Sequence, residues 1–260
     1  MPEQPSVTAI LKEYQNKIYR LALSISHNEK DAEDIVQNAF IKIVRGMPDF
    51  RNRSRLSTWI YRIAYNEALI YLRKKRRLSN FTNSFRDSVR HLPSGLAVNW
   101  AKMPDQELLD KELRQRIDAA LKFIPIQYRM PLFLHRIEGF SLAETAQILG
   151  IKPGTVKTRL HRAYLMVRNQ LNAYFHDRPV PGARQDARCS IWTGFLFDYA
   201  QERLDPERKQ SFHRHIQDCP RCNNFLDTYL QAIRITGVLE CPDVPDELKE
   251  KLQTFISSSK

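Results

Sequence analysis

The sequence predicts an all-α protein made of three small helical domains. Apolar residues recur at helical spacing through most of its 260 residues, and it lacks alternating β-branched runs long enough to form strands. This periodicity fails at residues 78–104 and 176–188, where proline, glycine and polar residues gather as they do in linkers. We therefore expect domains at residues 7–77, 105–175 and 189–258.

The charge of the chain points to a polyanionic partner. Lysine and arginine total 41 against 29 acidic residues, a formal net charge of +12, which suits nucleic acid or an anionic membrane surface. No apolar run approaches the roughly 18 residues of a spanning helix, and the first residues lack the basic start and apolar core of a signal peptide. We therefore expect a cytoplasmic protein without a membrane segment.

The first domain contains an acidic amphipathic helix in the segment DAEDIVQNAFIKIV. We place its acidic residues in the first helical turn, where the helix dipole favours negative charge, and an apolar face follows at helical spacing. The acidic residues are Asp31, Glu33 and Asp34, and the apolar face is Ile35, Ala39 and Ile43. On its own this pattern fits any amphipathic helix.

A basic and aromatic segment, FRNRSRLSTWIYRIAYNEALIYLRKKRR, follows the acidic helix. Aromatic rings stack on unpaired bases for roughly 1–3 kcal/mol each while cations follow the phosphates, so this composition suits melted DNA. In the alternative, the apolar side chains are mostly core beneath a basic surface. We expect a core position for Trp59 and a functional one for Tyr65 and Asn66. The aromatic residues interleaved with basic ones are Trp59, Tyr61, Tyr65 and Tyr71.

The second domain carries a helix-turn-helix pattern in FSLAETAQILGIKPGTVKTRLHRAYLMVR. Ser141 and Glu144 form a capping box, and Gly150 ends the first helix because glycine enters the left-handed conformation without a Cβ clash. The second helix has a polar outer face, as a recognition helix in the major groove has. An ordinary hairpin with a solvated basic face is the alternative, but the agreement of cap, turn and polar face favours DNA binding. The outward residues are Lys157, Thr158, His161 and Arg162, and the expected inward ones are Leu142, Ala146, Leu149, Val156, Leu160, Ala163 and Val167.

The third domain holds all four cysteines, which in a reducing compartment indicates metal binding or redox chemistry. His215 and Cys219 are one helical turn apart, and Cys219 and Cys222 flank a Pro-Arg turn, so three ligands converge. Cys189 can supply the fourth. Three thiolates and an imidazole favour a structural Zn²⁺, with iron or another thiophilic ion as the alternative.

Other readings of these residues stay open. His213 is a competing ligand at a less suitable spacing, Cys241 is a spare thiol, and unmetallated thiols in a small core are the alternative to a metal site. Four protein ligands would leave no coordination position for a substrate, and the sequence has neither a glycine-rich phosphate loop nor a nucleophile motif. We therefore expect no enzyme activity. An RNA-binding role is allowed by the charge but has no module signature.

Together, DAEDIVQNAF, STWIYRIAYNEALIYLRKKRR and GFSLAETAQILGIKPGTVKTRLHRA resemble, in that order, the extracytoplasmic-function class of bacterial sigma factors. The resemblance covers roughly residues 11–172. It implies that residues 7–77 are sigma region 2, that residues 105–175 are sigma region 4, and that the partners are core RNA polymerase and promoter DNA. A helix-turn-helix regulator that acts without polymerase is the alternative function.

The resemblance also implies roles for individual residues. The acidic helix, with Asp31, Asp34 and Gln37, would dock on the clamp helices of core polymerase. The minus-ten element would meet the loop FRNRSRL and the helix after it, with a base flipped into a pocket under the loop. The minus-ten residues would be Asn52, Arg53, Ser54, Tyr65 and Asn66, and the minus-thirty-five residues Lys157, Thr158, His161 and Arg162. Three arginines, at 51, 53 and 55, make this loop more basic than the family often has it, so no base preference is assigned.

The third domain resembles the zinc-binding anti-sigma domain, whose pattern is an early Cys or His followed by HxxxCxxC. Cys189, His215, Cys219 and Cys222 match that pattern in order. The anti-sigma domain is usually a separate protein that blocks the polymerase surface of a sigma factor, so its fusion here predicts regulation in cis. An activating metal or redox sensor is the rival reading. The residues expected to contact the sigma domains are Phe225, Leu226, Tyr229, Leu230 and Ile233.

Overall fold

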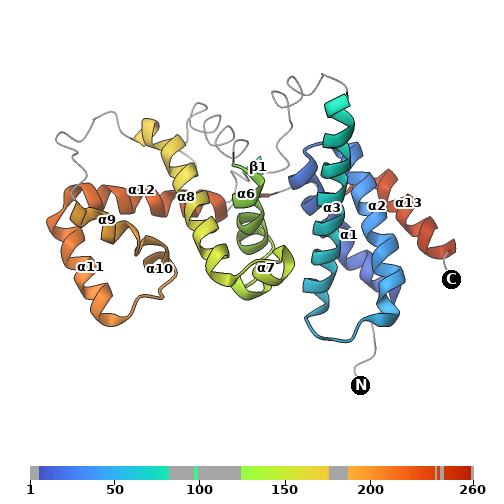
Figure 1. The fold of residues 1–260 in the computed structure, drawn as a ribbon, viewed down its shortest axis with the longest axis horizontal. Coiled ribbons are helices and arrows are strands. Elements are labelled where there is room, and N and C mark those ends of the chain that lie inside the picture. The colour runs from blue at the N-terminus through green and yellow to red at the C-terminus, as the bar shows by residue number, and fades with distance from the viewer. Residues whose placement is uncertain are drawn as a thin grey trace. The chain divides into compact units, whose positions relative to one another are not determined.

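The structure is a computed structural model that describes residues 6–81, 97–98, 124–175, 187–237, 239–240 and 243–258. Helices dominate these residues (Figure 1), and two strands of two residues each, β1 (Ala97–Val98) and β2 (Leu239–Glu240), form a small sheet. The all-α prediction is confirmed. In the described part of the chain, none of the helices has both the length and the apolar character needed to cross a bilayer. Most of the two expected linkers, residues 78–104 and 176–188, lies outside the described residues.

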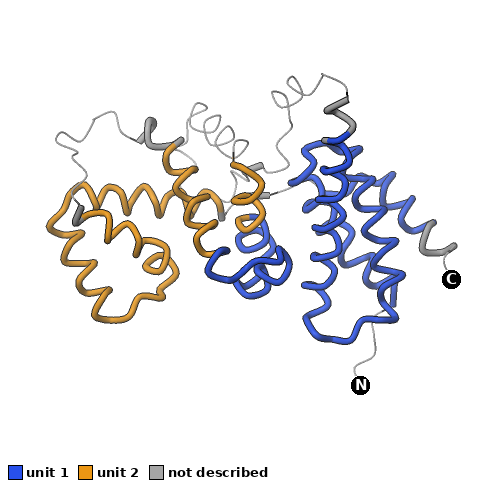
Figure 2. The backbone as a smooth tube through the Cα atoms, viewed as in Figure 1, with its two compact units in different colours: residues 1–97, 133–156, 240–260 blue, residues 98–132, 157–239 orange. Residues whose placement is uncertain are grey.

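The chain divides into two compact units, shown in different colours in Figure 2. The first unit comprises residues 1–97, 133–156 and 240–260, and the second comprises residues 98–132 and 157–239. Helix α8 (Pro153–Phe175) therefore gives its first turn to one unit and its remainder to the other.

The first unit contains α1 (Val7–Ser26), α2 (Glu29–Gly46), η1 (Met47–Asp49) and α3 (Leu56–Phe81). The Asn28 side chain caps α2 by accepting the backbone N–H of Asp31 at 3.0 Å. This helix begins earlier than the sequence suggested, so that Glu29 and Asp31 lie in its first turn while Glu33 and Asp34 follow. The predicted apolar face is confirmed: Ile35, Ala39 and Ile43 are all buried.

Helix α3 packs in the same unit against α7 (Leu142–Leu149), which follows the π-helical turn η4 (Phe133–Ile137). Tyr61 is buried, meets Phe140 edge to face with ring centroids 4.7 Å apart, and donates its hydroxyl to Glu138. Tyr61 is therefore a core residue. Trp59, expected in the core, is only half-buried and packs on Phe50 at 5.1 Å, because the loop before α3 covers one side of its ring.

The helix-turn-helix has the local geometry that the sequence predicted. Ser141 and Glu144 form the capping box, and Gly150 is left-handed with φ 66°. The expected inward residues of α8 are all buried: Val156, Leu160, Ala163 and Val167. In α7, Ala146 is buried as expected, whereas Leu142 and Leu149 are half-buried and Thr145 and Ile148 are buried. Helix α7 is thus rotated about its axis relative to the prediction, because its packing contacts select a different face.

The remaining helices range from 5 to 18 residues in length. Helix α6 (Ile126–Leu132) precedes η4, and the cysteine block, defined here as residues 187–237, consists of four helices. These are α9 (Ala187–Thr193), α10 (Leu196–Ala200), α11 (Pro206–Asp218) and α12 (Pro220–Gly237). The last helix, α13 (Asp246–Ser258), belongs to the first unit and packs against α1.

Candidate DNA-binding surfaces and metal centre

The three acidic-helix residues of α2 differ in exposure. Asp31 is buried, accepts the Tyr71 hydroxyl at 2.8 Å and forms an ion pair with Lys75, which ties α2 to α3. Asp34 is exposed and Gln37 is half-buried. The structure therefore leaves Asp34 and Gln37 at the surface and places Asp31 beneath them as a support.

A cavity of about 460 Å³ opens beneath the loop before α3. Its lining combines cations with aromatic rings, which suits a phosphate-linked base. The lining residues are Asp49, Phe50, Arg51, Arg53, Ser54, Thr58, Trp59, Arg62 and Gln147. Within this loop, Asn52 has a φ of 54°, a left-handed conformation that asparagine tolerates better than most residues. Two predicted minus-ten residues, Arg53 and Ser54, thus line this cavity.

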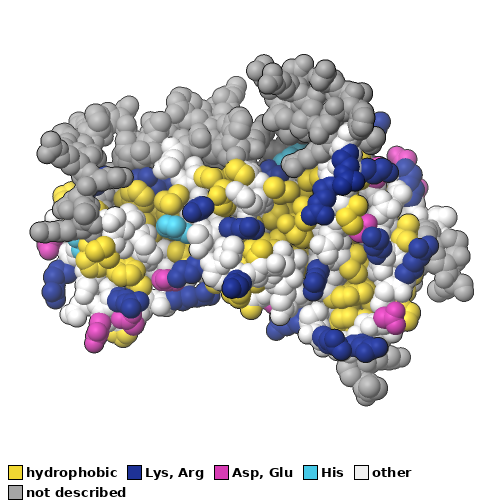
Figure 3. All heavy atoms as spheres, viewed as in Figure 1, with side chains coloured by type: hydrophobic (Ala, Val, Ile, Leu, Met, Phe, Trp, Pro, Cys, Tyr) yellow, Lys and Arg dark blue, Asp and Glu magenta, His cyan; other side chains and the backbone are white. Residues whose placement is uncertain are grey.

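The other minus-ten candidates lie farther along α3. Asn66 is exposed and lines a second hollow with Ile70 and Arg73, next to the ion pair of Lys42 and Glu67 at 2.5 Å. Tyr65 is half-buried. Figure 3 shows lysine and arginine side chains gathered over α3, among them exposed residues of its second half. The loop and the helix therefore present two separate hollows rather than one.

The four predicted residues of the recognition helix α8 fall into two pairs. Thr158 and Arg162 are exposed, whereas Lys157 and His161 are half-buried. Arg162 also donates to the Tyr128 hydroxyl at 3.3 Å. Burial, followed by the positive charges of Lys157 and Arg162, lowers the pKa of His161, so the neutral imidazole is favoured. The outward face of α8 is therefore only partly open to solvent.

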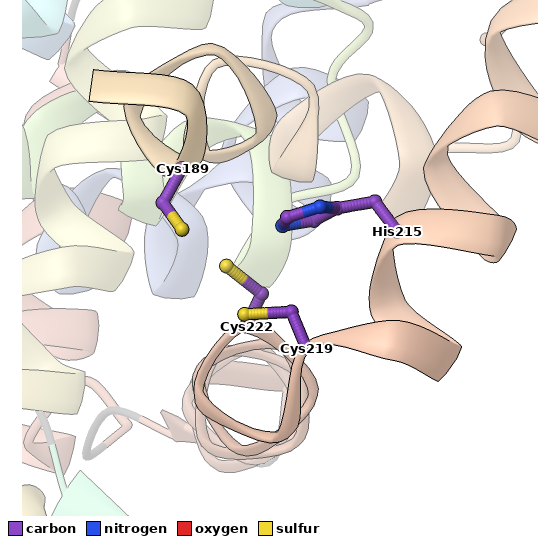
Figure 4. A group of neighbouring side chains, drawn as sticks. All are labelled: Cys189, His215, Cys219 and Cys222. Atoms are coloured by element: carbon purple, nitrogen blue, oxygen red, sulfur yellow. The ribbon is translucent and has the colours of Figure 1, made fainter. Parts of the chain in front are cut away.

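The cysteine block brings together the four predicted metal ligands (Figure 4). Cys189 lies within α9, His215 in the last turn of α11, Cys219 at the C-cap of α11 and Cys222 in α12. One ligand atom from each lies within 4.8 Å of all the others. The Nε2 atom of His215 is buried and has no hydrogen-bond partner, as expected of a nitrogen meant for a cation. The cluster can therefore hold a metal ion.

Aromatic packing orients this cluster. The Trp192 ring stacks on His215 with centroids 4.9 Å apart and an interplanar angle of 14°, and it also meets the fully buried Phe212 at 6.2 Å. His213, the competing ligand, is exposed and meets the Tyr199 hydroxyl at 3.2 Å. The stacking thus selects His215 over His213, because α11 turns the two rings in different directions.

The two neighbouring thiols of the cluster have different proton affinities. A hydrogen bond from the Cys222 backbone N–H lowers the pKa of the Cys219 thiol, whereas burial raises the pKa of the Cys222 thiol to about 12. Cys241 lies outside the described residues.

The sequence did not indicate which side chains contact the predicted DNA-binding residues. It did not single out Arg62 and Gln147, which complete the cavity beneath the loop, or Asp198, which pairs with Lys157 at 2.5 Å. Gln147 comes from α7, far along the chain from the loop, so no local sequence pattern could have signalled it.

Two family models match the chain: Sigma-70 region 2 at residues 10–78 and Sigma-70, region 4 at residues 114–167. Among relatives, the ECF RNA polymerase sigma factor SigW of Bacillus subtilis is 33% identical over 174 residues, covering 65% of this chain and 90% of that protein. The ECF RNA polymerase sigma-E factor of Escherichia coli K12 is 32% identical over 169 residues, covering 65% and 88%. A solved structure of the sigma factor RpoE with the anti-sigma factor NepR, from Bartonella quintana, has 26% identity and a TM-score of 0.49, covering 65% of this chain and 96% of that one.

Both matched families are regions of one class of protein, the sigma factors that direct bacterial RNA polymerase to promoters. Within that class, the chain belongs to the extracytoplasmic-function (ECF) family of RNA polymerase sigma factors. Sigma factors are transcription initiation factors rather than enzymes. Membership of this family favours a function as a sigma factor over a function as a helix-turn-helix regulator that acts without polymerase. Neither family model reaches the four metal-ligand residues.

Proposed function

We propose that this sigma factor reads both promoter elements with its two sigma regions and is regulated in cis by a C-terminal zinc-binding domain that resembles an anti-sigma domain. The observation that carries the proposal is the presence, in one chain, of two sigma regions and a Cys3His cluster. The expected domains at residues 7–77, 105–175 and 189–258 remain part of this proposal, as does action in the cytoplasm, where the polymerase works.

The proposed minus-ten surface is the loop before α3 together with α3 itself. The cavity beneath the loop supplies Trp59 for stacking and Arg53 for the backbone of a flipped base. Ser54 lines the same cavity, while Asn52, Tyr65 and Asn66 would meet neighbouring nucleotides along the loop and helix. A strand captured here would keep the duplex open.

The proposed minus-thirty-five surface is the outward face of α8. Lys157, Thr158, His161 and Arg162 would contact phosphates and base edges in the major groove. In region 2, we propose that Asp34 and Gln37 meet the clamp helices of core polymerase while Asp31 holds α2 in place.

The proposed metal is Zn²⁺. Three thiols and one imidazole are the donor set that zinc prefers, and four protein ligands make a closed, structural site. When bound, the ion would supply folding free energy on the order of 10 kcal/mol, which would stabilise a block this small. Loss of the metal or oxidation of its thiols would then change the fold of the block and its hold on the sigma regions.

Run-off transcription with core RNA polymerase tests this function. The full-length chain should bind core polymerase and start transcripts whose upstream sequences share two elements. A form that ends at Phe175 should be more active than the full-length chain and insensitive to chelators, whereas the full-length chain should gain activity when its metal is removed. Lower activity of the shortened form would instead make the C-terminal domain an activating sensor, and no binding to core polymerase would refute the proposal.

A further inference from the structure

Four residues of α8 form one line along the helix. Lys157, His161, Tyr164 and Arg168 are spaced by four, three and four residues, which places them on a single face. We call them the α8 stripe. In the second unit each of them contacts α10 or α12 of the cysteine block, and Figure 1 shows α12 crossing α8.

The N-terminal half of the α8 stripe makes polar contacts. Lys157 Nζ pairs with Asp198 Oδ2 at 2.5 Å, with the two side chains 41% and 23% exposed. His161 Nδ1 lies 2.9 Å from the Tyr229 hydroxyl, and the two rings are 5.5 Å apart. Two side chains that we assign to promoter DNA, Lys157 and His161, therefore already contact a carboxylate and a hydroxyl of the cysteine block.

The C-terminal half of the stripe is packed. Tyr164 is fully buried, 6.4 Å from the Phe197 ring and 5.9 Å from the Tyr229 ring. Arg168 is buried as well, with its guanidinium 3.5 Å from the centre of the Phe225 ring and its Nε donating to Thr228 at 2.8 Å. Such rings and a buried arginine are typical of the centre of an interface, so the polar contacts belong to a continuous packed surface.

We infer that the cysteine block and promoter DNA compete for the same face of α8. In the covered state, in which the block lies on α8, Asp198 takes the position of a DNA phosphate at Lys157. The Tyr229 hydroxyl contacts His161 and so keeps that side chain from DNA. The inference rests on the proposed role of α8 as the recognition helix. It differs from inhibition at the polymerase-binding surface, because here the masked surface is the one that reads DNA.

Competition on a tether has a defined consequence for affinity. The apparent dissociation constant for DNA equals the intrinsic constant divided by the fraction of molecules in which α8 is uncovered. A tether raises the effective concentration of the block to roughly the millimolar range, so a modest interface is enough to keep that fraction small. Thr158 and Arg162 are exposed beside the stripe, and they would make the first encounter with DNA.

The test compares full-length proteins that differ in the contacts with the stripe. In the double variant Asp198→Asn, Tyr229→Phe, the ion pair and the hydroxyl contact are removed while the rings stay. The matched control is Asp227→Asn, Tyr199→Phe, which makes the same chemical changes at an exposed carboxylate of α12 and at a hydroxyl that meets His213. The control is needed because removing any negative charge strengthens DNA binding.

The probe is a labelled DNA duplex of arbitrary sequence at low salt, where phosphate contacts dominate binding. We expect the Asp198, Tyr229 variant to bind it roughly tenfold more tightly than the control does, as the loss of one exposed ion pair and one hydrogen bond implies. We also expect the duplex to increase amide hydrogen exchange in α10 and α12 of the unmodified protein. Circular dichroism and metal content identify a misfolded variant, in which case Asp198→Asn alone, against Asp227→Asn, gives the comparison.

The outcomes separate this inference from the proposed function. Equal affinities of variant and control, with no change in exchange on adding the duplex, overturn the competition. If the same protein still binds core polymerase, the sigma function stands without it. Failure to bind core polymerase would overturn the proposed function, whatever the duplex affinities show.

Discussion

The two proposed DNA-binding surfaces of this sigma factor differ in what occupies them. The loop before α3 presents exposed Arg51 and Arg53 over an open cavity, whereas α8 has Lys157 and His161 engaged by the cysteine block. Both surfaces contain basic residues in the sequence. The difference teaches that the number of lysines and arginines on a helix does not decide whether they can bind DNA. A single carboxylate from elsewhere in the chain can form an ion pair with one of them.

The largest expected effect comes from the proposed metal ligands, because a metal bound by them would stabilise the cysteine block that contacts α8. Cys219→Ser should abolish metal binding and destabilise the cysteine block by several kcal/mol, on the order of the folding free energy that a structural zinc supplies. Metal content and the loss of helical signal on heating measure this. Cys241→Ser is the matched control and should keep both properties. Equal metal content in the two variants would show that Cys219 is not a ligand.

Arg53 tests the open surface. Arg53→Ala should weaken formation of the open promoter complex by roughly 1 kcal/mol. It should also reduce the slope of the logarithm of the binding constant against the logarithm of the salt concentration by about 1, as the loss of one phosphate contact does. Permanganate footprinting of the melted strand with core polymerase measures this. The control is Arg208→Ala, at an exposed arginine of α11 that pairs with Asp205 and is not among the proposed DNA contacts. An unchanged footprint for Arg53→Ala would remove this arginine from the proposed minus-ten site.

Arg162 and His161 sharpen the comparison within α8. Arg162→Ala should weaken duplex binding by roughly 1 kcal/mol, because it removes a DNA contact and leaves the stripe in place. His161→Ala should change duplex binding less, because it removes a DNA contact and a contact to Tyr229 together. Titrations of a labelled DNA duplex with each full-length variant, followed by fluorescence anisotropy, show which substitution weakens duplex binding more. A greater loss for His161→Ala would mean that its contact with Tyr229 adds little to the covered state.

The smallest expected effect is a pH dependence of the covered state. Burial and the charges of Lys157 and Arg162 lower the pKa of His161, while Asp198 of α10 opposes this shift and Tyr229 of α12 meets the ring. Because the pKa of His161 is lowered when the block lies on α8, this covered state has its full stability at pH values above 6.5, the ordinary pKa of histidine. It loses this stability as the pH falls through the lowered pKa of His161.

Acidification should therefore increase amide exchange in α12. The same titration of His161→Gln, which cannot take up the proton, provides the reference. Identical profiles for the two proteins would contradict a role for this histidine.

Much of the site was predictable where the signal is local. The capping box of Ser141 and Glu144, the left-handed Gly150 and the buried stripe of α8 follow from spacings of three and four residues. The Cys/His cluster was predictable for a similar reason, since HxxxCxxC places three candidate ligands within two helical turns of sequence. Cys189 was predictable only as a fourth donor, and the structure places it inside α9.

Longer-range features were predicted less well. Trp59 was expected in the core but lines the cavity beneath the loop, and Asp31 was expected at the polymerase surface but is buried against Lys75. An amphipathic pattern tells which face of a helix is apolar, but the environment of a residue at the margin of that face depends on which neighbour covers it.

The sequence by itself determined the helices, their caps, the turn of the helix-turn-helix and the HxxxCxxC part of the cluster, because these depend on contacts between residues close in the chain. Only the tertiary structure decided which cations of α8 are covered. Lys157 and Asp198 are 41 residues apart, and His161 and Tyr229 are 68 apart. At such separations a pair forms only if packing brings its two helices together, so its identity is a property of the fold and not of any local pattern.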